Sequence, residues 1–259
     1  MTTVPPYPQG LSLLAGKRVL ITAAAGTGIG YSTARRCVEE GAQVFVSDIH
    51  ERRLGEAVER LKSAGDGVAG GKTCDVTKEA DVRALVDQAI AALGGVDVLV
   101  NNAGLGGSAP VVEMTDEQWH KVLDVSLTSV FRMTRAILPH MYARGSGAIV
   151  NNASVLGWRA QALQSHYAAA KAGVMAFTRC SAVEAAEHSV RINAVAPSIA
   201  MHEFLNRVTS DDLLTELRRR EAFGRTAETW EIANVIVFLA SDLASYMTGE
   251  VVSVSSQRA

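Results

Sequence analysis

The chain has few of the residues that mark a specialised environment. It has only three cysteines, Cys37, Cys74 and Cys180. They are too far apart in the sequence to match a metal-binding or redox motif. Isolated thiols of this kind are usually small buried side chains in a reducing compartment. We therefore expect a cytoplasmic protein with no metal site.

Long apolar runs and an excess of one charge are also missing. No run approaches the roughly 20 apolar residues that span a bilayer, and the opening segment MTTVPPYPQG lacks the features of a signal peptide. Lys and Arg total 25 against 27 for Asp and Glu, a formal net charge of −2. Such a balance offers no basic surface to nucleic acid or to an anionic membrane, so neither is expected as a partner. The prolines predict a flexible N-terminal tail over residues 1–10.

What the chain does contain is a regular alternation of strand and helix patterns. Val/Ile/Leu-rich runs predict strands at residues 17–22, 43–48, 72–75, 96–101, 148–152, 190–195 and 250–254. Helical patterns occupy residues 29–40, 51–63, 78–93, 116–143, 165–187 and 229–240. This alternation predicts a single-domain α/β fold, a doubly wound parallel sheet of about seven strands with helices on both faces. We place the domain at residues 11–259, with a long insertion at 199–228 as the substrate loop.

A glycine-rich turn follows the first predicted strand. The segment TAAAGTGIG places Gly26, Gly28 and Gly30 just before a predicted helix. Such a turn lets the backbone approach a pyrophosphate, and the free N–H groups of the helix N-terminus can bind it. The spacing is Gly-x-Gly-x-Gly rather than the fingerprint Gly-x-Gly-x-x-Gly, so the position of the turn carries the dinucleotide prediction.

Asp48 ends the second predicted strand and bears on the choice of nucleotide. A carboxylate there can accept hydrogen bonds from the adenosine ribose and would repel a 2′-phosphate, which favours NAD over NADP. The alternative is an aspartate that caps the next helix. Arg52 and Arg53 follow closely and could reach a 2′-phosphate, although a solvated helix face explains them as well.

Ser154, Tyr167 and Lys171 lie together in the segment SVLGWRAQALQSHYAAAK. Tyr167 and Lys171 are one helical turn apart and would share a helix face. A nearby ammonium can lower the pKa of a tyrosine, about 10 when free, by roughly 1 to 3 units. Tyr167 could then transfer a proton near neutrality, while the Ser154 hydroxyl donates to the same substrate oxygen. On spacing alone, a surface Tyr–Lys pair is an equally good interpretation.

Taken in order, these landmarks resemble the short-chain dehydrogenase/reductase family along nearly the whole chain. The matching segments are Gly28-Ile29-Gly30, Asp48, Cys74-Asp75-Val76, Asn101-Asn102-Ala103-Gly104, the Ser/Tyr/Lys trio, Asn193-Ala194-Val195-Ala196-Pro197 and FLASDLASYMTGEVVSV. The resemblance implies a Rossmann-type fold, a nicotinamide cofactor and hydride transfer between an alcohol and a carbonyl.

The resemblance also implies roles for single residues. Tyr167 would be the general acid/base, Lys171 would lower its pKa and hold the nicotinamide ribose, and Ser154 would orient the substrate oxygen. The implied cofactor-binding residues, besides Tyr167 and Lys171, are Gly26, Thr27, Gly28, Ile29, Asp48, Asp75, Val76, Asn102, Ala103, Gly104, Pro197 and Ile199. Asp75 and the segment 101–104 could instead serve only as turns.

Three departures from the family pattern stand out. Ser126 replaces an asparagine that the family links to a water-mediated proton relay through Lys171, so we count Ser126 among the catalytic residues and expect a weakened relay. His202 stands where the family has a threonine that contacts the nicotinamide, although a surface loop histidine is the simpler interpretation. Ala23-Ala24 stand at the family's Thr-Gly, where the methyl of Ala24 could shift the turn.

Apolar side chains near the trio and in the insertion predict a pocket for a bulky alcohol or ketone. They are Leu105, Leu156, Trp158, Ile199, Met201, Phe204, Leu205 and Phe223, each of which could equally be core. Arg218, Arg219 and Arg220 form either a solvated face or a clamp for an acidic group such as a coenzyme A phosphate.

Several segments are similar to a subgroup of actinobacterial, FabG-like members of the family, some of which act on acyl-CoA or steroid-ring catabolic intermediates. The leading hypothesis is therefore an NAD-dependent secondary-alcohol dehydrogenase or ketone reductase, which the family resemblance implies to be a homotetramer. The alternatives are an NADPH-dependent 3-oxoacyl reductase and, in another class, a non-catalytic dinucleotide-binding sensor or scaffold.

Overall fold

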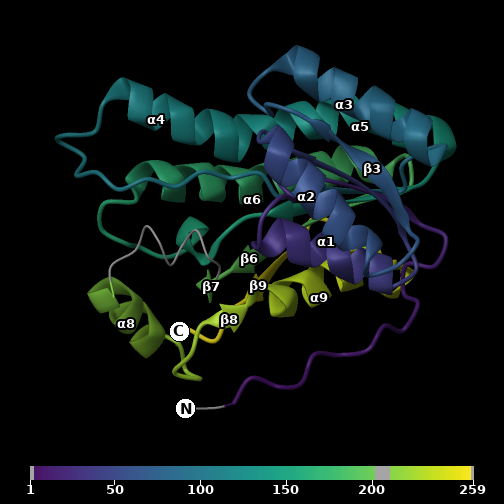
Figure 1. Ribbon diagram of the computed structural model, residues 1–259. Helices are drawn as coiled ribbons and strands as arrows, with labels where there is room; N and C mark the ends of the chain where they lie inside the picture. Colours follow the sequence, from purple (N-terminus) through teal and green to yellow (C-terminus); the bar gives the residue numbers. More distant parts are fainter. Residues whose placement is uncertain (1–2, 202–210, 258–259) are drawn as a thin grey trace.

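A seven-stranded parallel sheet forms the centre of the molecule, in the order β3-β2-β1-β4-β5-β6-β9 (Figure 1). The structure, a computed structural model, describes residues 3–201 and 211–257. The strands of this sheet are β1 (Arg18–Ile21), β2 (Gln43–Asp48), β3 (Val68–Thr73), β4 (Val98–Asn101), β5 (Gly147–Asn152), β6 (Val190–Pro197) and β9 (Val251–Val254). The predicted doubly wound α/β fold is confirmed.

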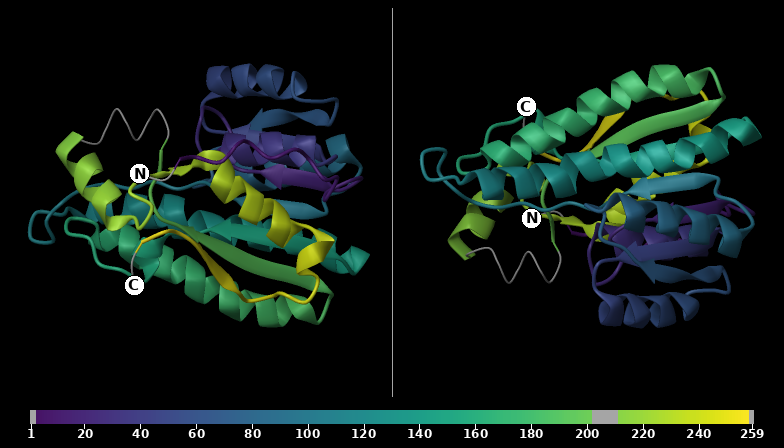
Figure 2. Two further views of the ribbon diagram at one scale, coloured as in Figure 1. Left: turned by 90° about the horizontal axis from the view of Figure 1, so that it is seen from below. Right: turned by 90° about the horizontal axis from the view of Figure 1, so that it is seen from above.

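Helices cover both faces of the sheet. They are α1 (Ile29–Glu39), α2 (Glu51–Lys62), α3 (Glu79–Leu93), α4 (Asp116–Leu123), α5 (Ser129–Arg144), α6 (Ser165–Ala186), α8 (Asp211–Arg220) and α9 (Thr229–Ala240). Helices α1, α2 and α9 lie on one face, and α3, α5 and α6 lie on the other, as the two perpendicular views agree (Figures 1 and 2). No helix in the described ranges is long and apolar enough to cross a membrane.

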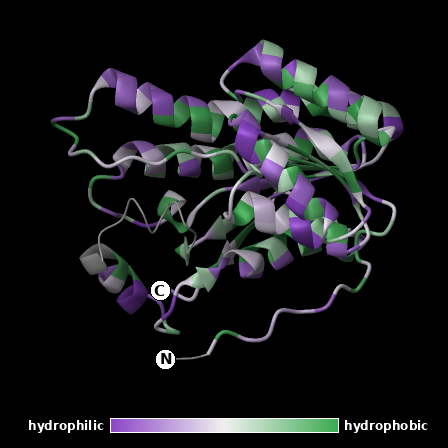
Figure 3. Cartoon of the chain, viewed as in Figure 1, coloured by the Kyte–Doolittle hydropathy of each residue, from purple (hydrophilic) through white to green (hydrophobic). Residues whose placement is uncertain are grey.

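The central strands are apolar throughout because their side chains pack into a hydrophobic core on each face of the sheet. In β2, Val44 and Val46 belong to the cluster beneath α1 and α9, while Phe45 between them belongs to the cluster beneath α3 and α5. Side chains alternate across a strand, so a sheet covered on both faces needs apolar residues at every position. Figure 3 shows this as a hydrophobic centre with hydrophilic residues on the outer sides of the helices.

The edge strand β3 is the one strand of the main sheet that the pattern located poorly. It runs over Val68–Thr73 rather than 72–75. Its sequence, VAGGKT, has no apolar run, and the register against β2 shifts between Val44 and Phe45. Gly70 adopts φ +128°, and a Cβ on Gly71 would lie 2.9 Å from the Val46 carbonyl oxygen. The close approach and the bulge require glycine, and glycine conceals the strand pattern.

The order of the strands determines where a ligand can bind. From β1 the chain builds outward to β2 and β3, and it then returns to add β4, β5 and β6 on the other side. The crossover helices therefore diverge between β1 and β4, which leaves a crevice beyond the carboxyl ends of these strands. The glycine turn, the segment after β4 and the segment after β5 all meet at this edge.

The insertion after β6 contains a small parallel pair, β7 (Ala200–Met201) with β8 (Ala227–Glu228), and the helix α8. The end of α8 is tied to the C-terminal segment, because the buried Glu221 carboxylate accepts hydrogen bonds from the Ser256 N–H at 3.2 Å and its hydroxyl at 2.7 Å. Arg159, which follows Ser154, in turn donates to Gln257 at 2.8 Å. The C-terminal segment thus joins the insertion to the loop after β5.

Specific contacts also hold the N-terminal segment that we expected to be a flexible tail. The Tyr7 hydroxyl donates to Glu39 at 2.6 Å, and its ring packs edge-on against Trp230 of α9 with the centroids 5.4 Å apart. The Arg36 guanidinium donates to the Pro8 carbonyl at 3.1 Å. Residues Tyr7 and Pro8 therefore lie against α1 and α9, an attachment that proline content could not indicate.

Candidate active site

The glycine turn after β1 is shaped for close approach of a ligand to the backbone. A Cβ on Gly30 would lie 2.3 Å from the Ala23 carbonyl oxygen and 2.4 Å from Asn102 Nδ2, so only glycine fits there. Gly26 has φ +98° and Ala23 has φ +51°, both in the left-handed region. The strained residue is therefore Ala23, rather than Ala24, whose methyl is buried in the core.

Helix α1 begins directly after this turn with its first N–H groups available. Gly28 is the N-cap residue, and no side chain caps the helix. A Cβ on Gly28 would meet nothing within 4 Å, so the space in front of the helix is open. An open helix N-terminus beside a glycine turn is a site for a phosphate group.

Asp48 lies against the same turn. Its Oδ2 accepts a hydrogen bond from the Ala25 N–H at 3.2 Å, and its Oδ1 accepts one from the His50 N–H at 3.1 Å. Burial raises the pKa of Asp48, while these backbone hydrogen bonds and the nearby Arg53 guanidinium act in the opposite direction. The carboxylate thus stands at the carboxyl end of β2, where it can accept hydrogen bonds from a ribose.

The segment after β4 is fastened to the glycine turn through Thr22, which sequence reasoning did not select. The Thr22 hydroxyl accepts from the backbone N–H groups of Asn102, at 3.0 Å, and Ala103, at 3.1 Å. Asn102 Nδ2 donates to the carbonyls of Thr22 and Ala23. A threonine at the end of the first strand, 80 residues away, gave no local signal for this contact.

Ser154 and Tyr167 meet at the carboxyl ends of β5 and β6. Ser154 follows β5, and its hydroxyl hydrogen-bonds to the Tyr167 oxygen, which acts to lower the pKa of the phenol. The Ser154 oxygen also accepts from the Leu156 N–H at 3.2 Å, which fixes the rotamer of the side chain. Two hydroxyl groups thus converge on one point, as binding and protonating a single carbonyl oxygen requires.

Lys171 is buried one helical turn below Tyr167. Its Nζ donates to the Asn152 carbonyl oxygen at 2.6 Å and lies 5.5 Å from the centroid of the Tyr167 ring. Burial lowers the pKa of Lys171 to about 8, so the amine titrates near neutral pH. A Cβ on Gly104 would lie 3.4 Å from this Nζ, so the segment after β4 packs closely against the buried ammonium.

The expected low pKa of Tyr167 is not found in the protein alone. Burial raises the pKa of Tyr167 to about 12, and the hydrogen bond from Ser154 only partly offsets that rise. The Lys171 ammonium lies beneath the ring and is held by the Asn152 carbonyl, rather than beside the phenol oxygen. Tyr167 is therefore a protonated acid in this state, and the lowering of its pKa by Lys171 stays a prediction.

Ser126 is fully buried in a π-helical segment, Asp124–Thr128, between α4 and α5. Its hydroxyl donates to the Leu105 carbonyl oxygen at 2.9 Å and accepts from the Leu105 N–H at 2.9 Å. A Cβ on Gly104 would lie 3.9 Å from the Ser126 oxygen and closer still to Lys171 Nζ. Ser126 thus supports the loop next to Lys171, and the geometry favours a positioning role over a chemical one.

The remaining predicted residues are placed less directly. Asp75 closes its own turn: hydrogen bonds from the Thr77 N–H and hydroxyl and from Lys78 outweigh the effect of burial and lower the pKa of Asp75. Pro197 ends β6, and the Ile199 carbonyl accepts from the Ala227 N–H at 2.9 Å beside the crevice. His202 lies outside the described residues.

The predicted substrate pocket is only partly defined. Leu105, Leu156, Ile199 and Met201 are half-buried, whereas Trp158 and Phe223 are exposed. Phe204 and Leu205 lie outside the described residues. At the end of α8, Arg220 pairs with Glu216, while Arg218 and Arg219 are exposed to solvent.

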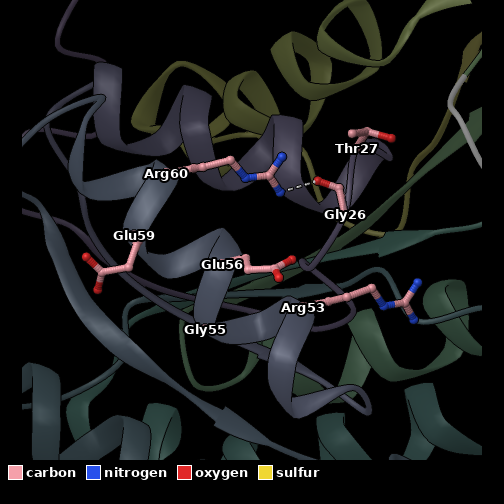
Figure 4. Close-up of a pocket in the computed structure, with 7 residues that line it drawn as sticks. All are labelled: Gly26, Thr27, Arg53, Gly55, Glu56, Glu59 and Arg60. Carbon is pink, nitrogen blue, oxygen red and sulfur yellow. Dashed lines mark hydrogen bonds between the residues drawn. The ribbon is translucent and has the colours of Figure 1, made fainter.

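A second hollow adjoins the glycine turn on the side of α2. It has a volume of about 670 Å³ and is lined by Gly26, Thr27, Arg53, Gly55, Glu56, Glu59 and Arg60. Figure 4 shows Arg60 reaching back to the Gly26 carbonyl, at 2.9 Å, from the opposite wall. Two arginines and two glutamates leave this wall without net charge, so it offers no strong preference for an added phosphate.

Together, these features fit a dinucleotide: a turn that excludes a Cβ at Gly30, an uncapped helix N-terminus, and an acceptor at Asp48. Residues 23–256 match the family model described as enoyl-(acyl carrier protein) reductase. Over 99% of this chain and 98% of the relative, the sequence is 62% identical to a reductase of Mycobacterium tuberculosis named for a hydroxy-methyl-oxo-hexahydroindene-carboxyl-CoA. The chain belongs to the short-chain dehydrogenase/reductase family. It is an oxidoreductase that interconverts an alcohol and a carbonyl compound.

Two further members of the family are similar to this chain in structure or in sequence. A crystal structure of a short chain dehydrogenase from Mycobacterium smegmatis superimposes with a TM-score of 0.89, at 59% identity and with 99% of each chain covered. The cis-4-hydroxycyclohexanecarboxylate dehydrogenase of Sinomonas cyclohexanicum is 41% identical in sequence. The match covers 92% of the present chain and 95% of the dehydrogenase.

Proposed function

We propose that this enzyme is an NAD(H)-dependent oxidoreductase that interconverts a ring alcohol and a ring ketone on a bulky, coenzyme A-linked catabolic intermediate. The observation that carries this proposal is the 62% identity, over nearly the full length of both chains, with a mycobacterial reductase named for a bicyclic CoA thioester. The Ser154–Tyr167 contact beside Lys171 supplies the chemistry that such a reaction needs.

In the direction of ketone reduction, Ser154 and Tyr167 would both hydrogen-bond to the ketone oxygen. The nicotinamide supplies the hydride to the carbonyl carbon when it is bound. Tyr167, kept protonated by a pKa of about 12, gives its proton to the oxygen as negative charge develops there. The phenolate that remains is stabilised by the Ser154 hydroxyl and the Lys171 ammonium. Because Tyr167 is protonated in the free enzyme, it can donate a proton at once, which favours the direction of ketone reduction.

The choice of NAD rests on Asp48. Its carboxylate is held at the edge of the glycine turn, where the 2′-phosphate of NADP would meet a like charge. That repulsion costs on the order of 1 to 4 kcal/mol at short range, so NADH should bind at least about fivefold more tightly than NADPH. Fluorescence titration of both nucleotides tests this, and tighter binding of NADPH would overturn the assignment.

The alternative, an NADPH-dependent 3-oxoacyl reductase, has one feature in its favour. Arg53 lies close enough to affect the pKa of Asp48, and it lines the hollow beside the glycine turn together with Arg60 (Figure 4). Removing the carboxylate with Asp48→Asn should therefore relax the preference, and Asp48→Asn with Arg53→Ala should weaken NADPH binding again. If Asp48→Asn leaves the ratio of the two affinities unchanged, Asp48 does not set the preference.

The coenzyme A moiety would extend past the insertion, where the last turn of α8 presents Arg218 and Arg219. These side chains are exposed and could pair with the phosphates of coenzyme A. Steady-state kinetics should compare a free hydroxy acid, cis-4-hydroxycyclohexanecarboxylate, with its coenzyme A thioester. We expect Arg218→Ala with Arg219→Ala to raise KM for the thioester alone, and equal efficiency of the wild type with both substrates would contradict a coenzyme A site.

We further propose a cytoplasmic homotetramer. The buried free cysteines Cys37 and Cys74 suit a reducing compartment. Large apolar side chains, among them Phe131, Val183 and Tyr246, stand exposed on the outer helices and near the C-terminus, as they would where subunits meet. Sedimentation equilibrium would measure the mass, and a monomer at micromolar concentration would contradict the assembly.

A further inference from the structure

Asn152 joins two parts of the active site that are far apart in the sequence. It is the last residue of β5, and its side-chain Nδ2 donates to Asn102 Oδ1 at 2.9 Å across a separation of 50 residues. Its backbone carbonyl is the acceptor for Lys171 Nζ at 2.6 Å. One residue therefore contacts both the turn after β4 and the buried lysine.

The orientation of the Asn152 amide is fixed by its neighbours. Asn102 donates its Nδ2 hydrogens to the carbonyls of Thr22 and Ala23, so its Oδ1 must face Asn152. Asn152 must then present its own NH₂ group to that oxygen. The consequence is that Asn152 Oδ1 points elsewhere, buried and without a hydrogen-bond partner among the described residues.

An unpaired buried amide oxygen is expensive. It costs about 1–3 kcal/mol of stability, and a leucine of similar volume would avoid that cost. The neighbouring Asn151 provides the contrast, because its side chain lies on the other side of β5 with both ends bonded, accepting from Asn101 at 2.9 Å and donating to Thr178 at 2.9 Å. Asn152 thus differs from its neighbour in retaining an unpaired side-chain acceptor, on the same residue whose backbone carbonyl binds Lys171.

We propose that Asn152 is a positioning residue that couples the dinucleotide-binding turn to Lys171, its side-chain amide holding Asn102 and its backbone carbonyl holding the Lys171 ammonium. The inference rests on the proposed roles of Asn102 and Lys171 in holding the cofactor. Burial of Lys171 is what shifts its pKa, and no carboxylate or guanidinium of the described chain contributes to that shift. Tyr167 is the titratable side chain beside it, so a charge placed at position 152 would act directly on the pair.

Binding of NADH, measured by fluorescence between roughly pH 6 and pH 10, tests the proposal without any alcohol substrate. In the wild type, binding should weaken as the pH rises through about 8, where Lys171 loses its charge. Asn152→Asp places a carboxylate beside the ammonium, which favours its charged form and should move this weakening about one pH unit higher. Asn152→Leu breaks the link to Asn102 and should raise the Kd for NADH about tenfold at pH 7.

Asn151→Leu is the matched control, since it removes a buried amide from the adjacent position on the opposite side of β5. It should lower the melting temperature and leave the Kd and its pH dependence at wild-type values. If both Asn152 variants behave like Asn151→Leu, Asn152 is only structural and the inference is wrong. Lys171→Met separates failure of the Asn152 inference from failure of the proposed function. Unchanged NADH binding in that variant would contradict the proposed role of Lys171 itself.

Discussion

At the scale of single residues, the site depends on groups whose surroundings oppose their usual chemistry. Tyr167 is held as a weak acid with a pKa of about 12, and Lys171 as a weak base with a pKa of about 8. Burial drives both shifts because the charged form of each group loses its hydration. At neutral pH the Tyr167 phenol is therefore uncharged and the Lys171 amine is mostly an ammonium, a balance that can change when a ligand displaces water from the crevice.

Tyr167→Phe removes the hydroxyl that we propose as the proton donor and leaves the ring in place. We expect turnover to fall by about 10²- to 10⁴-fold, the usual contribution of a positioned acid or base, with NADH affinity within a factor of about two. Steady-state kinetics and fluorescence titration measure the two effects. Tyr142→Phe makes the same change on α5, where the ring stacks on His188, and should leave turnover unchanged. Substantial activity in Tyr167→Phe would mean that another group donates the proton.

Gly30→Ala should weaken cofactor binding, although it adds only one methyl group. That methyl would stand 2.3 Å from the Ala23 carbonyl oxygen and 2.4 Å from Asn102 Nδ2, so the turn or the Asn102 amide must move. We expect a loss of NADH affinity of at least about tenfold together with a lower melting temperature. Gly55→Ala is the control, because a Cβ there meets nothing within 4 Å and a helical alanine is favoured by about 1 kcal/mol.

At the scale of elements, a buried ion pair attaches the segment before β1 to helix α1, a contact that the hydrophobic pattern of the sequence does not indicate. Arg36 of α1 pairs at 2.5 Å with Glu40, the C-cap residue of this helix, with almost no exposure of either side chain. Glu40 also accepts from the N–H groups of Leu11 at 2.8 Å and Leu13 at 3.0 Å, so the entry to β1 is attached to the end of α1. The segment before the first strand is thus held by a carboxylate rather than by apolar contacts alone.

Glu40→Gln should destabilise the fold by about 1–3 kcal/mol, because a charged acceptor of the buried Arg36 guanidinium and of the Leu11 and Leu13 N–H groups is lost while Arg36 keeps its pair with Glu39. Chemical denaturation gives the free energy of unfolding. Glu56→Gln is the control, since Glu56 pairs with Arg52 on the exposed face of α2 and such pairs contribute about 0–1 kcal/mol. Similar losses in both variants would show that the burial of Arg36 is not what matters.

At the scale of the whole molecule, one carboxylate links three elements at the amino edge of the sheet. Asp97, just before β4, accepts from the Arg18 side chain of β1 at 2.8 Å through both oxygens and from Arg144 of α5 at 2.6 Å. Burial acts to raise the pKa of Asp97, but the contacts from Arg18 and Arg144 outweigh it and lower the pKa. This contact closes the end of the sheet that lies opposite the active site.

The lowered pKa makes the stability of the protein depend on pH. A group with a lower pKa in the folded state stabilises the protein above its unfolded pKa, about 3.9 for aspartate, and this contribution is lost as the pH falls through the folded pKa. Asp97→Asn should therefore cost about 1–3 kcal/mol at pH 7, and the gap from wild type should narrow below about pH 4. Thermal melts across that range measure both, and a gap independent of pH would exclude the charge as the cause.

The sequence by itself determined the strand and helix alternation, because a sheet covered on both faces needs apolar residues throughout each strand. It also located the Ser154/Tyr167/Lys171 trio and Asp48, whose spacing along the chain is tied to local structure. Tertiary structure alone decided the contacts of Thr22 and Asn152, since the parallel order brings the ends of β1, β4 and β5 together across 50 residues in one contact and 80 in the other. It also decided the protonation of Tyr167, because burial, which no local pattern reveals, outweighs the hydrogen bond from Ser154 and raises the pKa of the phenol.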